Sequence, residues 1–219
     1  MPHANDRALP VLEIVSDVIC PWCYVGKRRL AQALAQLTDL KLEIRWRPFE
    51  LNPTMPTAGM DRRRYCIAKF GSLEYANQMY ERVIAAARVD GLALDLERIT
   101  RTPNTRAAHR LIDYAGLQGR QDALVDALFE AYFVNGQDVG SVLQLIDLAV
   151  AVGLERGAVT AMLAHNDGDA RIEAAERAAH ELGVEGVPAF LYNGRLLFSG
   201  AQSPQTIALA LQRAHARGL

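Results

Sequence analysis

The sequence predicts an α/β fold in which one sheet domain is interrupted by an all-helical insertion. Strand patterns combined with helix patterns occur at both ends of the chain, and about a hundred residues between them keep a helical period throughout. The chain has 219 residues, 50% of them hydrophobic, and a chain of this length buries a core without metal or disulfide support. We therefore expect a discontinuous sheet domain, residues 1–60 and 166–219, around a helical domain, residues 61–165.

The first fifty residues predict a strand, a helix and a second strand. Val11–Val15 is a β-branched run bounded by Pro10 and by a Ser-Asp pair, as strands are. After Pro21 the leucines recur at helical spacing, and residues 40–46 alternate between apolar and polar side chains, which indicates a half-buried strand. A helical crossover of this length normally joins parallel strands.

Residues 61–165 are interpreted as helical throughout. Apolar stripes run over residues 124–132 and 142–150, and the three consecutive arginines 62–64 are interpreted as a solvated helix face. The expected breaks between helices are Gly91, Gly116, Gly136 and Gly153.

The last fifty residues predict a helix, a hairpin and a closing helix. An Ala-rich helix is expected to be capped by Asp167 or Asp169 and to end at Gly183. Two short apolar runs then flank Asn193-Gly194, which is the strongest two-residue hairpin signal. Ser203 and Pro204 supply an N-cap and a first-turn proline for the closing helix.

The composition argues against several classes of partner. Lys and Arg number 24 against 25 Asp and Glu, so no net basic field attracts nucleic acid. No window approaches the roughly 20 apolar residues of a membrane-spanning helix, so no membrane partner is expected. Met1–Pro10 contains no apolar run of signal-peptide length, and we therefore expect a cytoplasmic protein. In a reducing compartment, a cysteine pair is more often catalytic or metal-binding than structural.

Cys20-Pro21-Trp22-Cys23 is the motif that carries chemistry. It follows a predicted strand and opens a predicted helix, and the Cβ atoms of residues three apart in a helix are close enough for a disulfide. Pro21 suits the first helical position, which leaves Cys20 as the N-cap. The sulfur of Cys20 is then expected to face the unpaired N–H groups and the positive end of the helix dipole, which favour a thiolate.

The alternative interpretation of the cysteine pair is half of a structural zinc site. Such a site needs two further ligands, and Cys66 and the five histidines stand at no zinc spacing. We therefore expect redox chemistry and no metal. Cys66 is expected to pack in the helical insertion as a small buried hydrophobe. Trp46 is expected to lie in the core, whereas Trp22 is expected to be partly exposed beside the thiols.

Several motifs occur in a fixed order along the chain. They are Ser16–Arg28, Trp46–Pro53, Asn104-Thr105, Ala108–Leu111, Tyr132-Phe133, Gly136–Gly140, Gly186–Pro188 and Ser199–Gln202. With these motifs the chain resembles, nearly end to end, the DsbA-like branch of the thioredoxin superfamily. Within that branch it is similar to the cytosolic group named for the frenolicin (polyketide-biosynthesis) oxidoreductases. The resemblance implies a thioredoxin-like fold with an inserted helical domain.

The resemblance also implies roles for named residues. Cys20 is the nucleophile, Cys23 resolves the mixed disulfide, and a cis peptide bond at Val187–Pro188 faces them. The implied function is thiol-disulfide exchange, in the oxidase, reductase or isomerase direction, on protein or small thiol and disulfide substrates. No bound cofactor is implied beyond the redox-active Cys20–Cys23 disulfide, with glutathione as a candidate co-substrate. The protein is expected to be a monomer or a homodimer.

The substrate-binding residues are expected to be Trp22, Val187, Pro188 and His109. For His109 two interpretations stay open: a helix histidine with a satisfied hydrogen bond, or a residue at the lip of the active-site cleft.

Two other functions compete with disulfide exchange. The first is a glutathione-dependent isomerase or transferase of the kappa and 2-hydroxychromene-2-carboxylate isomerase type. These enzymes share the inserted architecture and typically keep a serine at the position of Cys20, so the two cysteines argue against that function. The second is a non-catalytic binding protein or holdase that uses the cleft between the domains.

Overall fold

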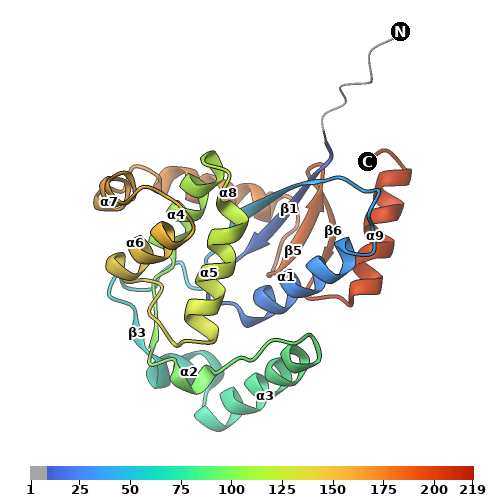
Figure 1. The fold of residues 1–219 in the computed structure, drawn as a ribbon. Coiled ribbons are helices and arrows are strands. Elements are labelled where there is room, and N and C mark those ends of the chain that lie inside the picture. Colours follow the sequence, from blue (N-terminus) through green and yellow to red (C-terminus); the bar gives the residue numbers. More distant parts are fainter. Residues whose placement is uncertain (1–8) are drawn as a thin grey trace.

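The computed structural model describes residues 9–219 (Figure 1). The interpretation of the N-terminus as free of a signal peptide therefore rests almost entirely on residues outside the described part. Among residues 9–219, no helix combines the length and the apolar character needed to cross a membrane.

The central element is a four-stranded mixed sheet with the strand order β2-β1-β5-β6. Its strands are β1 (Val11–Ser16), β2 (Glu43–Pro48), β5 (Ala189–Tyr192) and β6 (Arg195–Ser199). β1 pairs parallel with β2, as the crossover predicts, and antiparallel with β5. Asn193 and Gly194 both have positive φ, which is the backbone of the tight hairpin turn that their sequence predicts. The four strands bring residues from both ends of the chain side by side.

Helices cover both faces of the sheet because apolar residues alternate on its strands. On one face, Leu12 and Phe190 belong to the cluster that includes apolar residues of α1 (Pro21–Leu34) and α9 (Pro204–Ala216). On the other face, Val15 packs with Ala179 of α8 (Asp169–Glu181). α1 and α9 lie next to one another in Figure 1.

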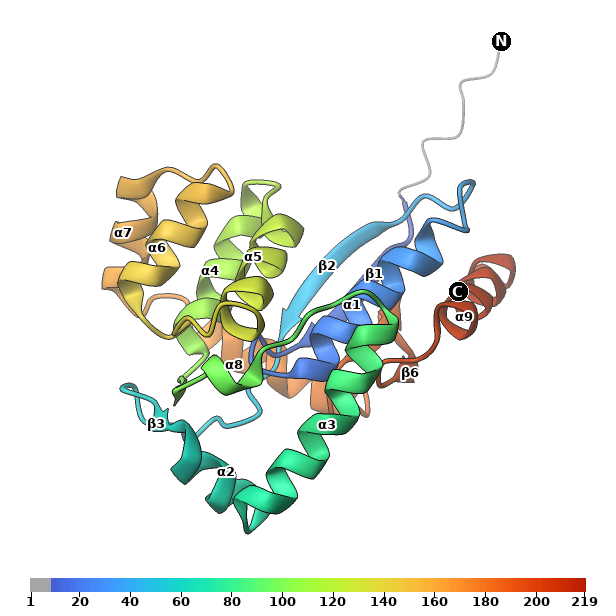
Figure 2. The same cartoon turned by 60° about the horizontal axis from the view of Figure 1, so that its bottom comes forward.

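The remaining helices lie between β2 and α8 in the sequence. They are α2 (Arg62–Phe70), α3 (Leu73–Val89), the 3-10 turn η1 (Leu96–Arg98), α4 (Arg106–Leu117), α5 (Gln121–Phe133), α6 (Val142–Ala151) and α7 (Arg156–Ala164). α4 and α5 contact β2. α2 and α3 extend away from α4, α5, α6 and α7, and α3 contacts α1 of the sheet domain (Figure 2).

One apolar cluster joins the sheet to the helices. It runs from Ile14 and Trp46 through Phe129 to Leu145, all of them buried. Trp46 is 4% exposed, which confirms that it belongs to the core. The division of the chain at residues 61 and 165 stays a prediction, because the two parts share this core.

The structure differs from the predicted elements at three places. Met60–Asp61 (β3) pairs antiparallel with Arg101–Thr102 (β4), a short ribbon for which two residues per strand leave no periodicity to detect. Gly116 lies inside α4, and the chain breaks at Gly119, where φ is +65°. α8 begins after Gly168 and not after an aspartate cap.

Candidate active site

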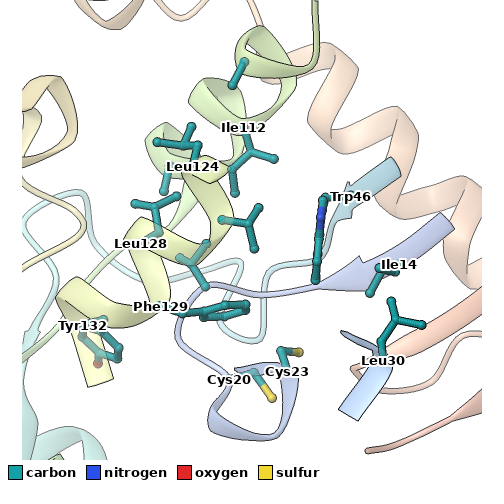
Figure 3. Close-up of a cluster of buried hydrophobic side chains, with 14 of the residues drawn as sticks. Ile14, Cys20, Cys23, Leu30, Trp46, Ile112, Leu124, Leu128, Phe129 and Tyr132 are labelled. Atoms are coloured by element: carbon teal, nitrogen blue, oxygen red, sulfur yellow. The ribbon is translucent and has the colours of Figure 1, made fainter. Parts of the chain in front are cut away.

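Cys20 stands at the N-cap of α1, with Pro21 as the first helical residue, as the motif predicts. The carbonyl of Cys20 accepts the Cys23 N–H at 2.9 Å, and the Cys20 N–H is donated to the Asp17 carbonyl at 3.0 Å. These two bonds fix the turn that presents both sulfurs. Figure 3 shows the two cysteines on this first turn, next to Phe129 of α5.

The loop before β5 faces this turn. The Val187–Pro188 peptide bond is cis, which confirms the prediction. The Cys20 thiol donates to the Val187 carbonyl, with 3.6 Å between sulfur and oxygen. The sulfur makes no hydrogen bond to the N–H groups of the first turn, which differs from the expected capping. In the thiol form Cys20 carries a proton to donate, and the Val187 carbonyl is the acceptor within reach. Cys20 and the Val187–Pro188 loop therefore form one site.

A close approach between α1 and this loop depends on Gly26. A Cβ atom at Gly26 would lie 2.9 Å from Cγ of Pro188, which is too short for an ordinary contact. The Pro188 carbonyl accepts the Gly200 N–H at 2.7 Å, so the loop is held from the β6 side as well. Pro188 is buried and Val187 is half-buried.

The two thiols differ in burial. Cys20 is 5% exposed and Cys23 is fully buried. Burial raises the pKa of the Cys23 thiol well above its ordinary value, and the adjacent Cys20 raises it further. The Ser16 side chain and the Asp17 backbone, which hydrogen-bond the Cys23 sulfur, lower it. Cys23 is thus held as a protonated thiol beneath Cys20, and all three cysteines of the chain are free.

Aromatic residues hold the start of α1 and line its exposed side. Tyr24 stacks on Phe129 with 5.1 Å between ring centroids, which fastens the active-site turn to α5. Trp22 is 37% exposed, which confirms that it is partly exposed. Its exposed part adds an apolar surface to this turn.

His109 lies deeper than the lip position that we considered. Its side chain, on α4, is only 2% exposed, and Nε2 lies 3.5 Å from Oδ1 of Asp17. Neither open interpretation matches this placement, because Nε2 forms no hydrogen bond among residues 9–219. His109 borders an open cavity of about 610 Å³ between β2, α4 and α8.

Asp17 is the site residue to which the sequence interpretation assigned no role. Its carboxylate is fully buried, where it accepts the Leu51 N–H at 2.7 Å and the Ile19 N–H at 3.3 Å. The available signal was an acidic residue three positions before the first cysteine. Aspartate is also common in the turns that follow strands, so the sequence alone does not indicate that Asp17 belongs to the site.

Cys66 lies away from the site. It is 5% exposed, and its sulfur lies 3.8 Å from the Tyr80 hydroxyl within the α2–α3 hairpin, which confirms the predicted packing. Within residues 9–219, no group of three His, Cys, Asp or Glu side chains is arranged to hold a metal ion.

Known proteins resemble this chain in sequence and in fold. The sequence profile of the DSBA-like thioredoxin domain matches residues 11–212. A probable DsbA oxidoreductase from Streptomyces coelicolor superposes with a TM-score of 0.85 at 35% identity, over 94% of this chain and 90% of the other. A 2-hydroxychromene-2-carboxylate isomerase has a TM-score of 0.70 at 19% identity, over 95% of this chain and 97% of the other.

A third structure is the cytosolic disulfide reductase DsbM from Pseudomonas aeruginosa, solved with GSH. It has a TM-score of 0.65 at 18% identity, over 94% of this chain and 98% of the other. At these identities, the isomerase and the reductase establish a shared fold. The thioredoxin-like fold with inserted helices that the sequence predicts is confirmed.

Proposed function

The chain belongs to the DSBA-like thioredoxin domain family, and on that premise we propose that it is a thiol-disulfide oxidoreductase working through Cys20 and Cys23. Disulfide oxidoreductase chemistry is the general activity of that family. The observation that carries the proposal is the placement of Cys20, at the N-cap of α1 and 3.6 Å from the Val187 carbonyl.

The proposed reaction has two exchange steps. The Cys20 thiolate attacks one sulfur of a substrate disulfide, forms a mixed disulfide and releases the other substrate sulfur as a thiolate. Cys23 then loses its proton and attacks the Cys20 sulfur. This attack forms the Cys20–Cys23 disulfide and releases the second substrate sulfur. Two electrons pass from the cysteine pair to the substrate, and the reverse sequence oxidises a dithiol substrate.

The different burial of the two thiols supports this order. Cys20 is the sulfur with some exposed surface, and the helix N-terminus next to it stabilises a negative charge. Cys23 is fully buried, so a substrate cannot reach it without passing Cys20. The Val187 backbone next to Cys20 would pair with an extended substrate in the manner of an added strand. Trp22 and Pro188 would complete the surface that contacts the substrate. His109 is buried, so it could contact the substrate only after a movement that exposes its side chain.

We further propose a cytoplasmic protein of the frenolicin-type branch, with protein or small disulfides as substrates and glutathione as co-substrate. Trp22 stands where well-known exported DsbA oxidants have a histidine, which favours a role other than pure oxidation. A cytosolic glutathione pool near about −220 mV or below keeps many dithiols reduced. DsbM, a cytosolic disulfide reductase solved with GSH, shares the fold of this chain.

Turnover assays test the proposal against the isomerase alternative. Reduction of insulin by the purified protein, with glutathione as reductant, is the expected result. Glutathione-dependent isomerisation of a 2-hydroxychromene carboxylate without disulfide reduction would favour the isomerase, whose fold the chain shares. Binding of unfolded protein with neither reaction would contradict both enzymes and favour a holdase.

A further inference from the structure

The strand β2 leaves one edge of the sheet free. It stands first in the strand order β2-β1-β5-β6, so one of its edges pairs with no strand of residues 9–219. On its other edge, the Glu43 N–H is donated to the Pro10 carbonyl, at the start of β1, at 2.9 Å. Main-chain groups of successive residues point to opposite sides of a strand. Ile44, Trp46 and Pro48 therefore turn their main-chain groups away from β1, toward the free edge.

The side chain of Gln121 covers the middle of this edge. The Trp46 N–H is donated to Oε1 of Gln121 at 2.9 Å, and the Trp46 carbonyl accepts Nε2 at 3.2 Å. Nε2 is also donated to the Ile112 carbonyl of α4 at 3.3 Å. Gly116 leaves room for this amide, because a Cβ atom there would lie 3.1 Å from Nε2. One side-chain amide thus gives Trp46 the donor and the acceptor that a neighbouring strand would supply.

The amide of Gln121 covers one position of the edge and leaves the next one open. Ile44 lies two residues before Trp46 and presents its N–H and carbonyl to the same side, where residues 9–219 supply no partner for either group. Pro48, two residues after Trp46, has no N–H, so the donors of the edge end there. The edge therefore keeps an unpaired donor and an unpaired acceptor at Ile44.

A cavity of about 610 Å³ lies along this edge, between β2, α4 and α8. All six residues of β2 line it, together with Gln121. Its apolar wall includes Ile112 of α4 and Ile172 of α8, both buried, and Leu117 at the end of α4, which is 77% exposed. A large apolar side chain so exposed beside a cavity favours an occupant that carries apolar side chains.

The charges around the cavity balance one another. Arg45 pairs with Glu43 at 2.7 Å, and Arg171 of α8 pairs with Asp113 of α4 at 3.1 Å. Three positive and three negative residues line the cavity, and they are Glu43, Arg45, Arg47, Asp113, Asp122 and Arg171. Such a wall creates no net field for a strongly charged ligand. An uncharged chain with free N–H and carbonyl groups is the chemistry that matches the edge.

We propose that the free edge of β2 binds an extended, uncharged polypeptide segment as an added strand, in the cavity between β2, α4 and α8. The proposal rests on the proposed function, because the segment belongs to a protein substrate whose cysteine reacts with Cys20. Ile44 gives the first pair of hydrogen bonds, and displacement of the Gln121 amide releases Trp46 for a second pair. β1 lies between β2 and β5, so this site is separate from the Val187–Pro188 loop.

Amide exchange in the unmodified protein tests the site directly. The probe is a short, capped peptide of alternating valine and threonine that contains no cysteine. At a saturating concentration of this peptide, we expect exchange of the Ile44 N–H, followed by NMR, to slow at least about fivefold, the factor that corresponds to one hydrogen bond. The amides of β6, the strand at the other edge of the sheet, should keep their exchange rates.

Two variants with opposite expected effects test the same hydrogen bonds. Ile44→Pro removes an N–H that faces the free edge and leaves the pairing with β1 intact, so the peptide should bind about fivefold more weakly. Ile44→Val keeps that N–H and is the matched control, which should bind as the unmodified protein does. Gln121→Ala frees the main-chain groups of Trp46, so the peptide should bind about fivefold more tightly.

Two disulfide substrates connect the site to catalysis. A small aromatic disulfide releases one coloured thiolate when Cys20 attacks it and a second when Cys23 resolves the mixed disulfide. Ile44→Pro should keep both releases at the rates of the unmodified protein. For an unfolded polypeptide that contains a disulfide, the same variant should raise KM about fivefold, because the added strand is weakened.

Three results would overturn the proposed site. They are unchanged Ile44 exchange in the presence of the peptide, equal slowing of exchange in β2 and β6, and peptide binding that neither Ile44→Pro nor Gln121→Ala changes. The first two do not depend on the folding of any variant. Peptide binding at β2 with an unchanged KM for the polypeptide would overturn its role in substrate binding. By contrast, an unmodified protein that releases no thiolate from the small disulfide would contradict the proposed function itself.

Discussion

Replacing Gly26 by alanine tests whether the contact between α1 and the Val187–Pro188 loop sets the active site. The added Cβ would lie 2.9 Å from Cγ of Pro188 and 3.6 Å from Cζ of Phe190, whereas ordinary contacts begin at 3.4 Å. The buried proline ring cannot rotate away, so the helix and the loop must separate by about 0.5 Å, the difference between 2.9 and 3.4 Å.

Two effects of opposite sign decide the stability of this variant. Overpacking costs about 1–3 kcal/mol, whereas alanine in a helix interior gains about 1 kcal/mol over glycine. We expect a net loss of about 1 kcal/mol, or roughly 2–4 °C in melting temperature for a chain of this size. Separation of Val187 from Cys20 should also slow formation of the mixed disulfide.

Chemical denaturation and single-turnover thiol release measure the two effects. Gly186→Ala is the matched control, since a Cβ there meets no atom within 4 Å and the residue lies in the same loop. The control should stay within about 0.5 kcal/mol of the unmodified protein. If Gly26→Ala instead stabilises the protein by its helix propensity and keeps the rate of the first step, the close approach does not constrain the site.

Three further predictions concern stability and thiol chemistry. Arg106→Met leaves the Glu50 carboxylate, whose side chain is 1% exposed, without its cation, and should cost about 3 kcal/mol in urea denaturation; a loss below about 1 kcal/mol would contradict a buried ion pair. Cys66→Ala should lower stability by about 1 kcal/mol and leave both thiol releases unchanged, and loss of either release would give Cys66 a redox role. In Cys20→Ser, burial keeps the pKa of Cys23 raised, so the ultraviolet absorbance of its thiolate should keep growing with pH beyond the ordinary thiol value of about 8.5; a titration of Cys23 that is complete below that value would refute the burial argument.

The sequence could predict those features that local patterns encode. Pro21 at the first helical position, the Asn193-Gly194 turn and the Ser203 cap, which accepts the Thr206 N–H at 3.1 Å, are determined by neighbouring residues. The parallel pairing of β1 and β2 follows from the length of the crossover. These features lie within a few residues of the signals that predict them, and the motif Cys20–Cys23 belongs to them.

The remaining features depend on residues distant in sequence. His109 stands 92 positions after Asp17, the difference of their residue numbers, and periodicity shows only that it lies on a helix. Its burial follows from the packing of α4 against β2 and α8. Gly26 is another example, because its need to be glycine comes from Pro188 on the far side of the sequence. Long-range packing of this kind leaves no local signal.

Comparison of Cys20→Ser with Cys23→Ser, incubated with a glutathione disulfide and with cell extract, tests the proposed mechanism most directly. Mass spectrometry and non-reducing gels then detect the adducts. Cys23→Ser should accumulate mixed disulfides on Cys20 because no internal thiol resolves them, and Cys20→Ser should form none because Cys23 is fully buried. Adducts on Cys23 in the Cys20→Ser protein, or no adducts in either variant, would contradict the assignment of Cys20 as the nucleophile.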